Sequence, residues 1–468
     1  MLRTILSRNL TIVIAALILF LPIHCAAQDA TTKAVDDFVQ AEMKRQRLPG
    51  VSLAVVKNGA IVYAKGYGYS NVEHQVTVKP ETIFQSGSIG KQFTATAVMM
   101  LVEEGKVNLD EKISKYLGEV PKAWQNITVR HLLTHTSGLT DYPSDFDFRR
   151  DYTEDELLKR AQAIPPDFQP GEKWQYSNIG YVTLGVLIHK VTGQFYGDFL
   201  QERIFKPLKM TTTRIISEAD IIPNRAAGYH IVKNELKNQD WVSPTLNTTA
   251  DGALYFTVLD MAKWDAALYG ETLLKKSSLQ QMWTPVTLNN KKTYDYGFGW
   301  GFSQINGHRI IEHGGAWQGF TSYIGRFVDD KLTVIVLDNL AGGNTGKIGR
   351  HVASIFNPEL GRKAIADKEP EVTAAIRELV DKLTLGNADP NSFTAEMRAD
   401  SFSVRTERVA RLLKSLGPIT RMDLVERSDK DGARVYGYQI TFQNGSRFLK
   451  LSMTTENKIA ALAFVDDF

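Results

Sequence analysis

The chain has 468 residues, of which 43% are hydrophobic and 23% charged, and its formal net charge is +3 at pH 7. This near-neutral balance, with no long basic run and no interleaved aromatic patch, excludes a nucleic-acid-binding protein. The length is sufficient for a large packed core, and the single cysteine allows no disulfide within the chain.

The first residues, 1–27, have the pattern of an export signal. Arg3 and Arg8 precede an apolar stretch over 10–23, and the small residues that end at Ala27 suit cleavage after it. The two arginines account for two of the three net positive charges. The mature chain is therefore expected to be almost neutral.

A lipid anchor at Cys25 is not expected, because His24 stands where a lipoprotein signal has a small residue. Cleavage after Ala27 would also remove Cys25, the only cysteine. No later segment is apolar and long enough to span a bilayer. The sequence thus predicts an exported protein, periplasmic or secreted, with no membrane span once the signal is removed.

The next segments are two short β runs. Val51–Val56 and Ala60–Ala64 are expected to form a hairpin around Lys57-Asn58-Gly59, which is a typical turn. Tyr69-Ser70-Asn71 follows this hairpin and is interpreted as a strand end or a turn.

Ser88-Ile89-Gly90-Lys91 is the only Ser-x-x-Lys in the chain, and an apolar run from Phe93 to Val102 follows it. A helix that starts near Ser88 would place the hydroxyl and the Lys91 amine on one face. Its first backbone N–H groups would favour developing negative charge. These are the components that serine acyl transfer needs. The alternative is an N-capping serine and a solvated lysine.

Two other catalytic patterns are less well supported. His131 and His135 are four residues apart, as in zinc sites, but the glutamate of the metalloprotease pattern is missing and no cysteine ligand is available. Both histidines are therefore interpreted as structural. Ser86 replaces the first glycine of a Gly-x-Ser-x-Gly elbow, so that reading is unsupported. No metal and no cofactor are expected.

Two further polar segments follow in chain order. Tyr176-Ser177-Asn178 precedes the apolar run Ile179–Val191, and a loop there would place a phenol and an amide beside a pocket. His313-Gly314-Gly315 ends the strand-like Arg309–Glu312, and its two glycines would let a backbone edge approach a bound substrate.

A second group of β runs lies in this later part of the chain. The expected strands are Tyr296–Phe302, His308–Glu312, Thr321–Phe327 and Leu332–Leu337. The glycine-rich Gly297–Gly301 is interpreted as part of the first of them, because no helix pattern follows it. Between the two groups of strands the chain is mostly helical, and this order predicts the α+β class.

Taken in order, these motifs resemble the class C-like branch of the serine β-lactamase and penicillin-binding protein superfamily, which includes esterases, D-aminopeptidases and DD-peptidases. Further similar segments are Leu132–Leu139, Gly180–Gly185, Val191–Gly193 and Asp251–Leu254. The resemblance covers residues 31–358. It implies an antiparallel sheet flanked by helices and joined to a helical subdomain, with the site at their junction.

The resemblance also implies roles for individual residues. The catalytic candidates are Ser88, Lys91 and Tyr176, and the substrate-binding candidates are Asn178, His313, Gly315 and Ala316. Ser88 would attack an ester or amide carbonyl, with the backbone N–H groups of Ser88 and Ala316 as the oxyanion hole, and water would release the acid. Lys91 and Tyr176 would share the proton transfers, in an order that the sequence leaves open.

One position departs from the pattern. Penicillin-directed members of the superfamily usually have lysine where this chain has His313, and a histidine is largely neutral at pH 7. An exported esterase or peptidase is therefore favoured, acting on a small ester or peptide. A β-lactamase or penicillin-binding DD-peptidase is the alternative. A penicillin sensor without turnover, or a structural protein on this fold, also stays open, as does the oligomeric state.

A smaller second domain is expected after the polar connector 359–370. Two helical patterns are followed by four strand patterns over 371–468, with Asn444-Gly445 as a turn signal. This α+β accessory domain loosely resembles the cone-shaped domains of the nuclear-transport-factor type. Its role is expected to be packing, binding or assembly.

Overall fold

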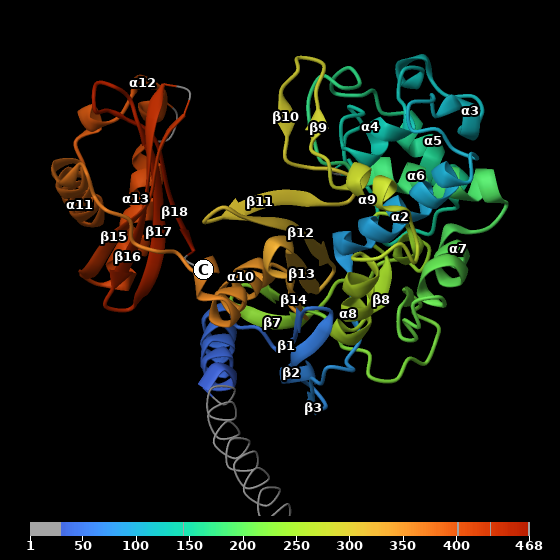
Figure 1. The fold of residues 1–468 in the computed structure, drawn as a ribbon, viewed down its shortest axis with the longest axis horizontal. Coiled ribbons are helices and arrows are strands. Elements are labelled where there is room, and N and C mark those ends of the chain that lie inside the picture. Colours follow the sequence, from blue (N-terminus) through green and yellow to red (C-terminus); the bar gives the residue numbers. More distant parts are fainter. Residues whose placement is uncertain (1–29, 144, 400–401, 431, 467–468) are drawn as a thin grey trace, which may run out of the picture. The chain divides into compact units, whose positions relative to one another are not determined.

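The computed structural model of the chain describes residues 30–143, 145–399, 402–430 and 432–466 (Figure 1). The chain divides into two compact units, Met1–Pro358 and Glu359–Phe468. The predicted export signal, including Cys25, lies outside the described residues. Among the helices that the structure describes, none has the length and apolar character needed to cross a bilayer.

The first unit is built on a seven-stranded sheet with the strand order β11-β12-β13-β14-β1-β2-β3. Its strands are β1 (Gly50–Lys57), β2 (Ala60–Asn71), β3 (Val76–Thr77), β11 (Gly301–Ile305), β12 (His308–Trp317), β13 (Phe320–Phe327) and β14 (Leu332–Asp338). All neighbouring strands are antiparallel, and β14 pairs with β1 from Val51↔Asp338 to Lys57↔Leu332. Every residue of β13 and β14 is buried, as expected for strands covered on both faces.

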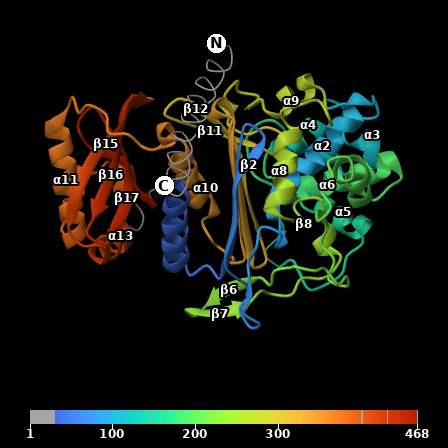
Figure 2. The same ribbon diagram turned by 60° about the horizontal axis from the view of Figure 1, so that its bottom comes forward.

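Helices cover the two faces of this sheet (Figure 2). A helix over 30–46 and α10 (Thr345–Phe356) lie on one face, where the ring of Phe38 stacks on His351 with centroids 3.7 Å apart. α8 (Val258–Ala267) lies on the other face, together with the helical part of the unit. The sheet is thereby shielded, and its C-terminal strands are joined to the N-terminal hairpin.

The helical part lies between the two groups of strands in the sequence. Its helices are α2 (Gly90–Glu103), α3 (Ser114–Leu117), α4 (Val129–Leu133), α5 (Glu154–Gln162), α6 (Asn178–Thr192), α7 (Tyr196–Leu200) and α9 (Lys276–Met282). Short strands accompany them: β4 (Phe84–Gln85), β5 (Arg214–Ile215), β6 (Tyr229–Val232), β7 (Glu235–Asn238), β8 (Leu254–Phe256), β9 (Val286–Thr287) and β10 (Thr293–Tyr294).

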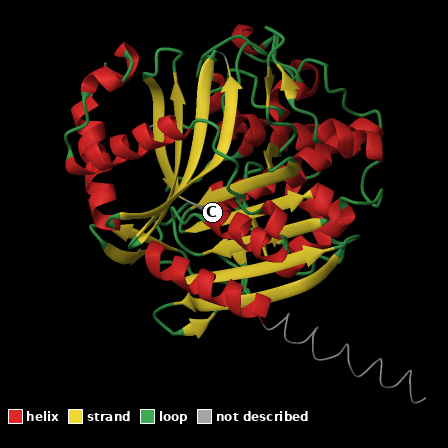
Figure 3. Cartoon of the chain, turned by 60° about the vertical axis from the view of Figure 1, so that its left-hand side comes forward, coloured by secondary structure: helices red, strands yellow, loops and turns green. Residues whose placement is uncertain are grey.

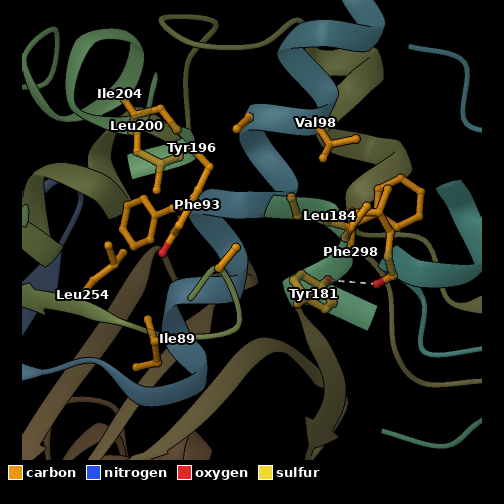
Figure 4. Packing of buried hydrophobic residues seen from close by; sticks show 14 of the residues in the cluster. Ile89, Phe93, Val98, Tyr181, Leu184, Tyr196, Leu200, Ile204, Leu254 and Phe298 are labelled. Atoms are coloured by element: carbon orange, nitrogen blue, oxygen red, sulfur yellow. Dashed lines mark hydrogen bonds between the residues drawn. The ribbon is translucent and has the colours of Figure 1, made fainter. Parts of the chain in front are cut away.

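Helix α2 runs through the middle of this core (Figure 4). Phe93 packs toward Tyr196 and Leu254 on one side of the helix, and Val98 lies toward Leu184 on the other. Tyr181 is fully buried and donates its hydroxyl to the carbonyl of Leu133 at 2.9 Å. The helix that carries Ser-x-x-Lys is therefore held on all sides.

The predicted α+β class, with an antiparallel sheet flanked by helices, is confirmed. The predicted hairpin is β1–β2, and Tyr69-Ser70-Asn71 ends β2 as expected. The predicted strand Tyr296–Phe302 is wrong, since β11 begins only at Gly301. Residues 296–300 form a turn instead, because Gly299 has φ +74° and its backbone lies against Lys91. Burial of Phe298 and Trp300 in this turn mimics the alternation of a strand.

The second unit contains a four-stranded antiparallel sheet with helices packed on it (Figure 3). Its elements are α11 (Pro370–Leu385), α12 (Ala395–Arg398), α13 (Phe402–Leu416), β15 (Ile419–Lys430), β16 (Ala433–Phe442), β17 (Gly445–Met453) and β18 (Ile459–Asp466). Apolar residues of α11 and α13, such as Val380 and Leu413, form a separate core with strand residues such as Tyr438 and Leu449. The predicted order of helices followed by strands agrees with this unit.

Candidate active site

Ser88 lies in a short 3₁₀ helix, Gly87–Ile89, that leads directly into α2. Gly87 has φ +50°, a conformation that favours glycine, and a Cβ added there would lie 2.4 Å from the backbone N of Ala316. Ser86 fixes the turn because its buried hydroxyl donates to the carbonyl of Gly252 at 2.6 Å. The predicted helix start at Ser88 is therefore found, and the Ser88 side chain is half-buried.

Lys91 is the second residue of α2 and is fully buried, and its Nζ contacts three acceptors. Nζ donates to Ser88 Oγ at 3.1 Å, to Asn178 Oδ1 at 2.7 Å and to the carbonyl of Asp251 at 2.5 Å. The amine is thereby held beside the serine hydroxyl.

Tyr176 and Asn178 come from the start of α6, where the Ser177 side chain accepts from Gly180 N and caps the helix. Asn178 bridges Lys91 and the carboxylate of Asp141, to which its Nδ2 donates at 3.0 Å. The ring of Tyr176 lies 4.9 Å from Lys91 Nζ. Its hydroxyl is buried and has no hydrogen-bond partner among the described residues, so it is free to meet a reacting group.

Strand β12 forms the opposite wall of the site. A Cβ added at Gly315 would lie 2.1 Å from the carbonyl of Ser86 and 3.0 Å from Ser88 N, so only glycine allows this approach. Ser322 on the neighbouring strand donates its hydroxyl to the same Ser86 carbonyl at 2.6 Å. The triplet was expected to end a strand, but β12 continues to Trp317, and it is this continuous strand edge that faces Ser88.

A chain of hydrogen bonds joins two histidines through Tyr296. The backbone N–H of Ser177 donates to His135 Nδ1 at 3.2 Å, so Nε2 of the neutral His135 ring carries the proton and donates to the Tyr296 hydroxyl at 3.2 Å. Tyr296 in turn donates to His313 Nε2 at 2.9 Å, and His313 Nδ1 donates to the carbonyl of Gly314 at 2.5 Å. The four bonds have one consistent direction only when both imidazoles are neutral.

The electrostatics of the site agree with this assignment. Burial, together with the nearby Lys91 ammonium, lowers the pKa of His135 well below its usual value. The same two causes, burial first, lower the pKa of His313 to about 4. Burial raises the pKa of Asp251, although Lys91 opposes this effect. Both histidines are therefore neutral at neutral pH and add no positive charge to the site.

A hollow of about 40 Å³ opens beside the serine. It is lined by Gly87, Ser88, Asn178, Thr249, residues 251–253, Ala316 and Trp317. The indole of Trp317 donates to Asn247 Oδ1 at 2.9 Å, which fixes its orientation. The serine hydroxyl is thus bordered by an open space on the side of Asn178 and Ala316.

The structure brings all the residues expected at the site to this one place. The elements that contribute them are η1 (Gly87–Ile89), α2, the start of α6 and β12. Sequence reasoning missed three contributors, which are Tyr296, the carbonyl of Asp251 and the ring of His135. Asp251 and His135 belong to segments that resemble the family, and this was the available signal. No comparable signal marks Tyr296.

The two spaced histidines do not form a metal centre. His131 Nδ1 lies 3.2 Å from Thr128 N and belongs to the cap of α4, whereas His135 has φ +59° and its ring lies 4.2 Å from that of Tyr176. In the described part of the chain, no group of histidine, cysteine and acidic side chains has the arrangement of a metal site.

A buried lysine beside a serine at a helix N-terminus, with an unpartnered phenol nearby, is the arrangement that serine acyl-transfer enzymes need. Residues 35–354 match the family model described as Beta-lactamase. The chain therefore belongs to the β-lactamase family of serine hydrolases.

Individual relatives agree with this membership. The chain is 32% identical over 314 residues to "Penicillin-binding protein 4*" of Bacillus subtilis (strain 168), a match that covers 63% of this chain and 69% of the relative. It is similar to the structure of D-amino acid amidase from Ochrobactrum anthropi SV3, with a TM-score of 0.61, 26% identity, and coverage of 72% of this chain and 97% of the amidase.

A third likeness extends further along the chain. The fold is similar to that of the octameric penicillin-binding protein homologue from Pyrococcus abyssi, with a TM-score of 0.65 and 24% identity. This similarity covers 93% of this chain and 98% of the homologue, a larger share of this chain than the first unit alone.

Proposed function

We propose that this chain is an exported serine hydrolase that cleaves esters or amides through an acyl-enzyme on Ser88. The observation that carries this proposal is the contact of 3.1 Å between Lys91 Nζ and Ser88 Oγ. Ser88 Oγ attacks the carbonyl carbon, the bond to the leaving group breaks, and the leaving group departs with a proton. Water then attacks the acyl-enzyme and releases the acid.

Two groups are placed to move the protons. Lys91 contacts the serine hydroxyl directly, whereas the Tyr176 hydroxyl is buried and unpartnered among the described residues. One of them takes the serine proton and the other passes a proton to the leaving group. These groups lie close enough to act as a coupled pair, and we assign the two steps to the pair.

The developing oxyanion would be bound by the backbone N–H groups of Ser88 and Ala316. The support is the close packing of this backbone, since added Cβ atoms at Gly87 and Gly315 would lie 2.4 Å from Ala316 N and 3.0 Å from Ser88 N. Donors fixed in this way need no reorganisation during the reaction, and this is the main source of their effect. Asn178 borders the same hollow and would bind the acyl side of the substrate.

The preferred substrates would be esters and amides without a carboxylate at the position facing His313. Both ring nitrogens of His313 are engaged, one with Tyr296 and one with Gly314, and the ring is neutral at pH 7. It therefore provides neither a charge nor a free N–H for an anionic group. A β-lactam, which carries a carboxylate, would bind less well than a neutral ester.

Intact-mass spectrometry combined with ester turnover tests this proposal. The mature protein is incubated with a fluorophosphonate, a penicillin, a p-nitrophenyl ester and an amino-acid amide, because one similar structure is that of an amidase. We expect a fluorophosphonate adduct on Ser88 and continuing turnover of the ester or the amide. A stable penicilloyl adduct with negligible turnover of both would instead indicate a penicillin-binding protein.

A further inference from the structure

A second groove lies in the first unit, away from Ser88. It has a volume of about 510 Å³ and opens between the end of α8, helix α9 and strands β12 and β13. Apolar and aromatic side chains dominate its lining, among them Leu268, Tyr269, Leu279, Trp283, Ile311 and Val328. The groove is separate from the serine site. Arg326 at its base lies on β13, four residues after Ser322, whose hydroxyl contacts the backbone beside Ser88. Four residues of a strand span about 13 Å.

The base of this groove contains a buried arginine. Arg326 is 1% exposed, and its Nε donates to Asp265 Oδ1 at 2.7 Å. Its Cζ lies 4.7 Å from the ring centroid of Tyr269, 5.1 Å from that of Trp283 and 5.9 Å from that of Trp300. The aromatic rings thus hold the guanidinium plane in place.

Two residues of the groove lining have a buried N–H donor without an acceptor among the described residues, Arg326 at Nη1 and Trp283 at Nε1. Trp300 Nε1 is also unpaired, but Trp300 lies beside Arg326 and is not part of the lining. The neighbouring carboxylate of Asp265 accepts through Oδ1 from Arg326 Nε and Thr333 Oγ1, and not from Arg326 Nη1. Buried donors are almost always paired in folded proteins, so a concentration of unpaired ones indicates that an acceptor belongs there.

The charged residues that line the groove are all basic, and they are Lys276, Arg309 and Arg326. Two of them are paired with carboxylates outside the lining, Arg326 with Asp265 at 2.7 Å and Arg309 with Asp329 at 2.6 Å. Within the described residues the Lys276 side chain has no ion pair, so it supplies the uncompensated positive charge at the rim. A negatively charged acceptor would therefore complement both the unpaired donors and the rim.

We propose that this groove binds a small carboxylic acid with an apolar body. Its carboxylate oxygens would accept from Arg326 Nη1 and from the indole N–H of Trp283, and its apolar body would lie against Leu268, Leu279 and Ile311. A simple inorganic anion would leave the apolar walls uncovered, and an uncharged apolar molecule would leave the donors unpaired. The proposal does not depend on the chemistry of Ser88.

Calorimetry on the full-length Ser88→Ala protein tests the site without turnover. Octanoate is the probe, and octan-1-ol and inorganic phosphate are the comparison ligands. We expect saturable 1:1 binding of octanoate, with binding of octanol and phosphate at least about tenfold weaker because each lacks one half of the complementarity. The proposal would be overturned if octanol bound as tightly as octanoate, or if octanoate showed no saturable binding.

Variants locate the binding within the molecule. Trp283→Phe keeps the ring but removes one donor, and we expect it to weaken octanoate binding by about fivefold. Trp241→Phe is the matched control, since Trp241 is 54% exposed and does not line the groove. In an NMR spectrum, octanoate should shift the indole N–H signal of Trp283 and leave that of Trp241 unchanged. Unaltered binding by Trp283→Phe, or an unshifted Trp283 signal, would contradict the assignment.

Discussion

The Tyr296 hydroxyl donates to Nε2 of His313 at 2.9 Å, and this bond determines what the histidine offers to a substrate. The acceptor nitrogen is occupied, and the other ring nitrogen donates to Gly314. His313 is therefore part of the wall of the site. This arrangement supports the proposed preference for substrates that need no cationic anchor.

Replacing His313 with lysine should shift the preference toward anionic substrates. A lysine there would supply a charge and free N–H donors next to the substrate carboxylate, and a charged hydrogen bond contributes about 1.5–3 kcal/mol. We expect the acylation rate by a penicillin, relative to kcat/KM for a neutral ester, to rise by about tenfold or more in His313→Lys. His74→Lys adds the same charge at an exposed position and is the control. An unchanged ratio would show that His313 does not face the substrate carboxylate.

The pH dependence of kcat/KM should reflect the lowered pKa of His313. Because that pKa is about 4, the ring stays neutral and keeps accepting from Tyr296 at every pH above this value. Protonation at lower pH would force Nε2 to become a donor and break the bond. The acid limb that His313 contributes should therefore have its midpoint near 4. A limb near the usual histidine pKa of about 6.5, absent from His313→Asn, would contradict this assignment.

Gly315→Ala should impair catalysis far more than Gly314→Ala. An added Cβ at Gly315 would collide with the Ser86 carbonyl at 2.1 Å and displace the backbone beside Ser88 N. At Gly314 the nearest atom would be the Ser322 carbonyl at 3.7 Å, an ordinary contact. Loss of an oxyanion-hole donor typically lowers kcat by about 100-fold to 1000-fold, and we expect Gly315→Ala to fall in that range. Equal effects of the two substitutions would remove the argument for a fixed oxyanion hole.

Asp338 should make the stability of the first unit depend on pH. It is fully buried at the end of β14 and accepts from Thr321 Oγ1 at 2.6 Å and Leu340 N at 2.9 Å. Burial raises its pKa from 3.8 to about 7. The folded state thus binds this proton more tightly than the unfolded state. Its contribution is complete below the unfolded pKa and is lost as the pH rises through the folded pKa.

Asp338→Asn removes this dependence because an amide does not ionise. Between about pH 5 and pH 8, the free energy of unfolding of the parent protein should fall by about 2 kcal/mol more than that of the variant. Thermal unfolding over this range measures the difference, and Asp198→Asn, at an exposed position on α7, is the control. Parallel pH curves for parent and Asp338→Asn would refute the prediction.

Expression of the full chain in a bacterium with an export pathway tests the predicted signal. Cleavage after Ala27 should give a protein that is recovered outside the cytoplasm and has the mass of a chain that begins at Gln28. A protein that keeps residues 1–27 in the cytoplasm would show that the segment is not a signal. A mass increase from a lipid attached to Cys25 would instead show that a lipoprotein signal can have His24 before the modified cysteine.

Local sequence patterns predict much of the fold. The β1–β2 hairpin and the start of α2 follow from turn residues and apolar runs close together in the sequence. The turn at Tyr296–Trp300 could not be predicted, because its shape depends on the packing of Gly299 against Lys91, more than 200 residues earlier in the chain. The buried aromatic residues of that turn have the same spacing as a half-buried strand.

The residues of the site likewise divide into those that sequence motifs predict and those that depend on contacts across the fold. Ser88, Lys91, Tyr176 and His313 could be proposed because their motifs occur in a recognised order. The roles of Tyr296 and of the Asp251 carbonyl depend on contacts across the fold, with His313 and with Lys91. A backbone carbonyl leaves no signature in the sequence. A single tyrosine among 17 carries too little information to be chosen.

The central claim is that Ser88 is the nucleophile, and one comparison tests it most directly. The parent protein and Ser88→Ala are treated with a fluorophosphonate, mapped by peptide mass spectrometry, and assayed for ester turnover. The structure predicts one adduct on Ser88 in the parent, no adduct in the variant, and loss of turnover by at least about 1000-fold with the fold retained. Turnover that survives in a folded Ser88→Ala protein would contradict the account.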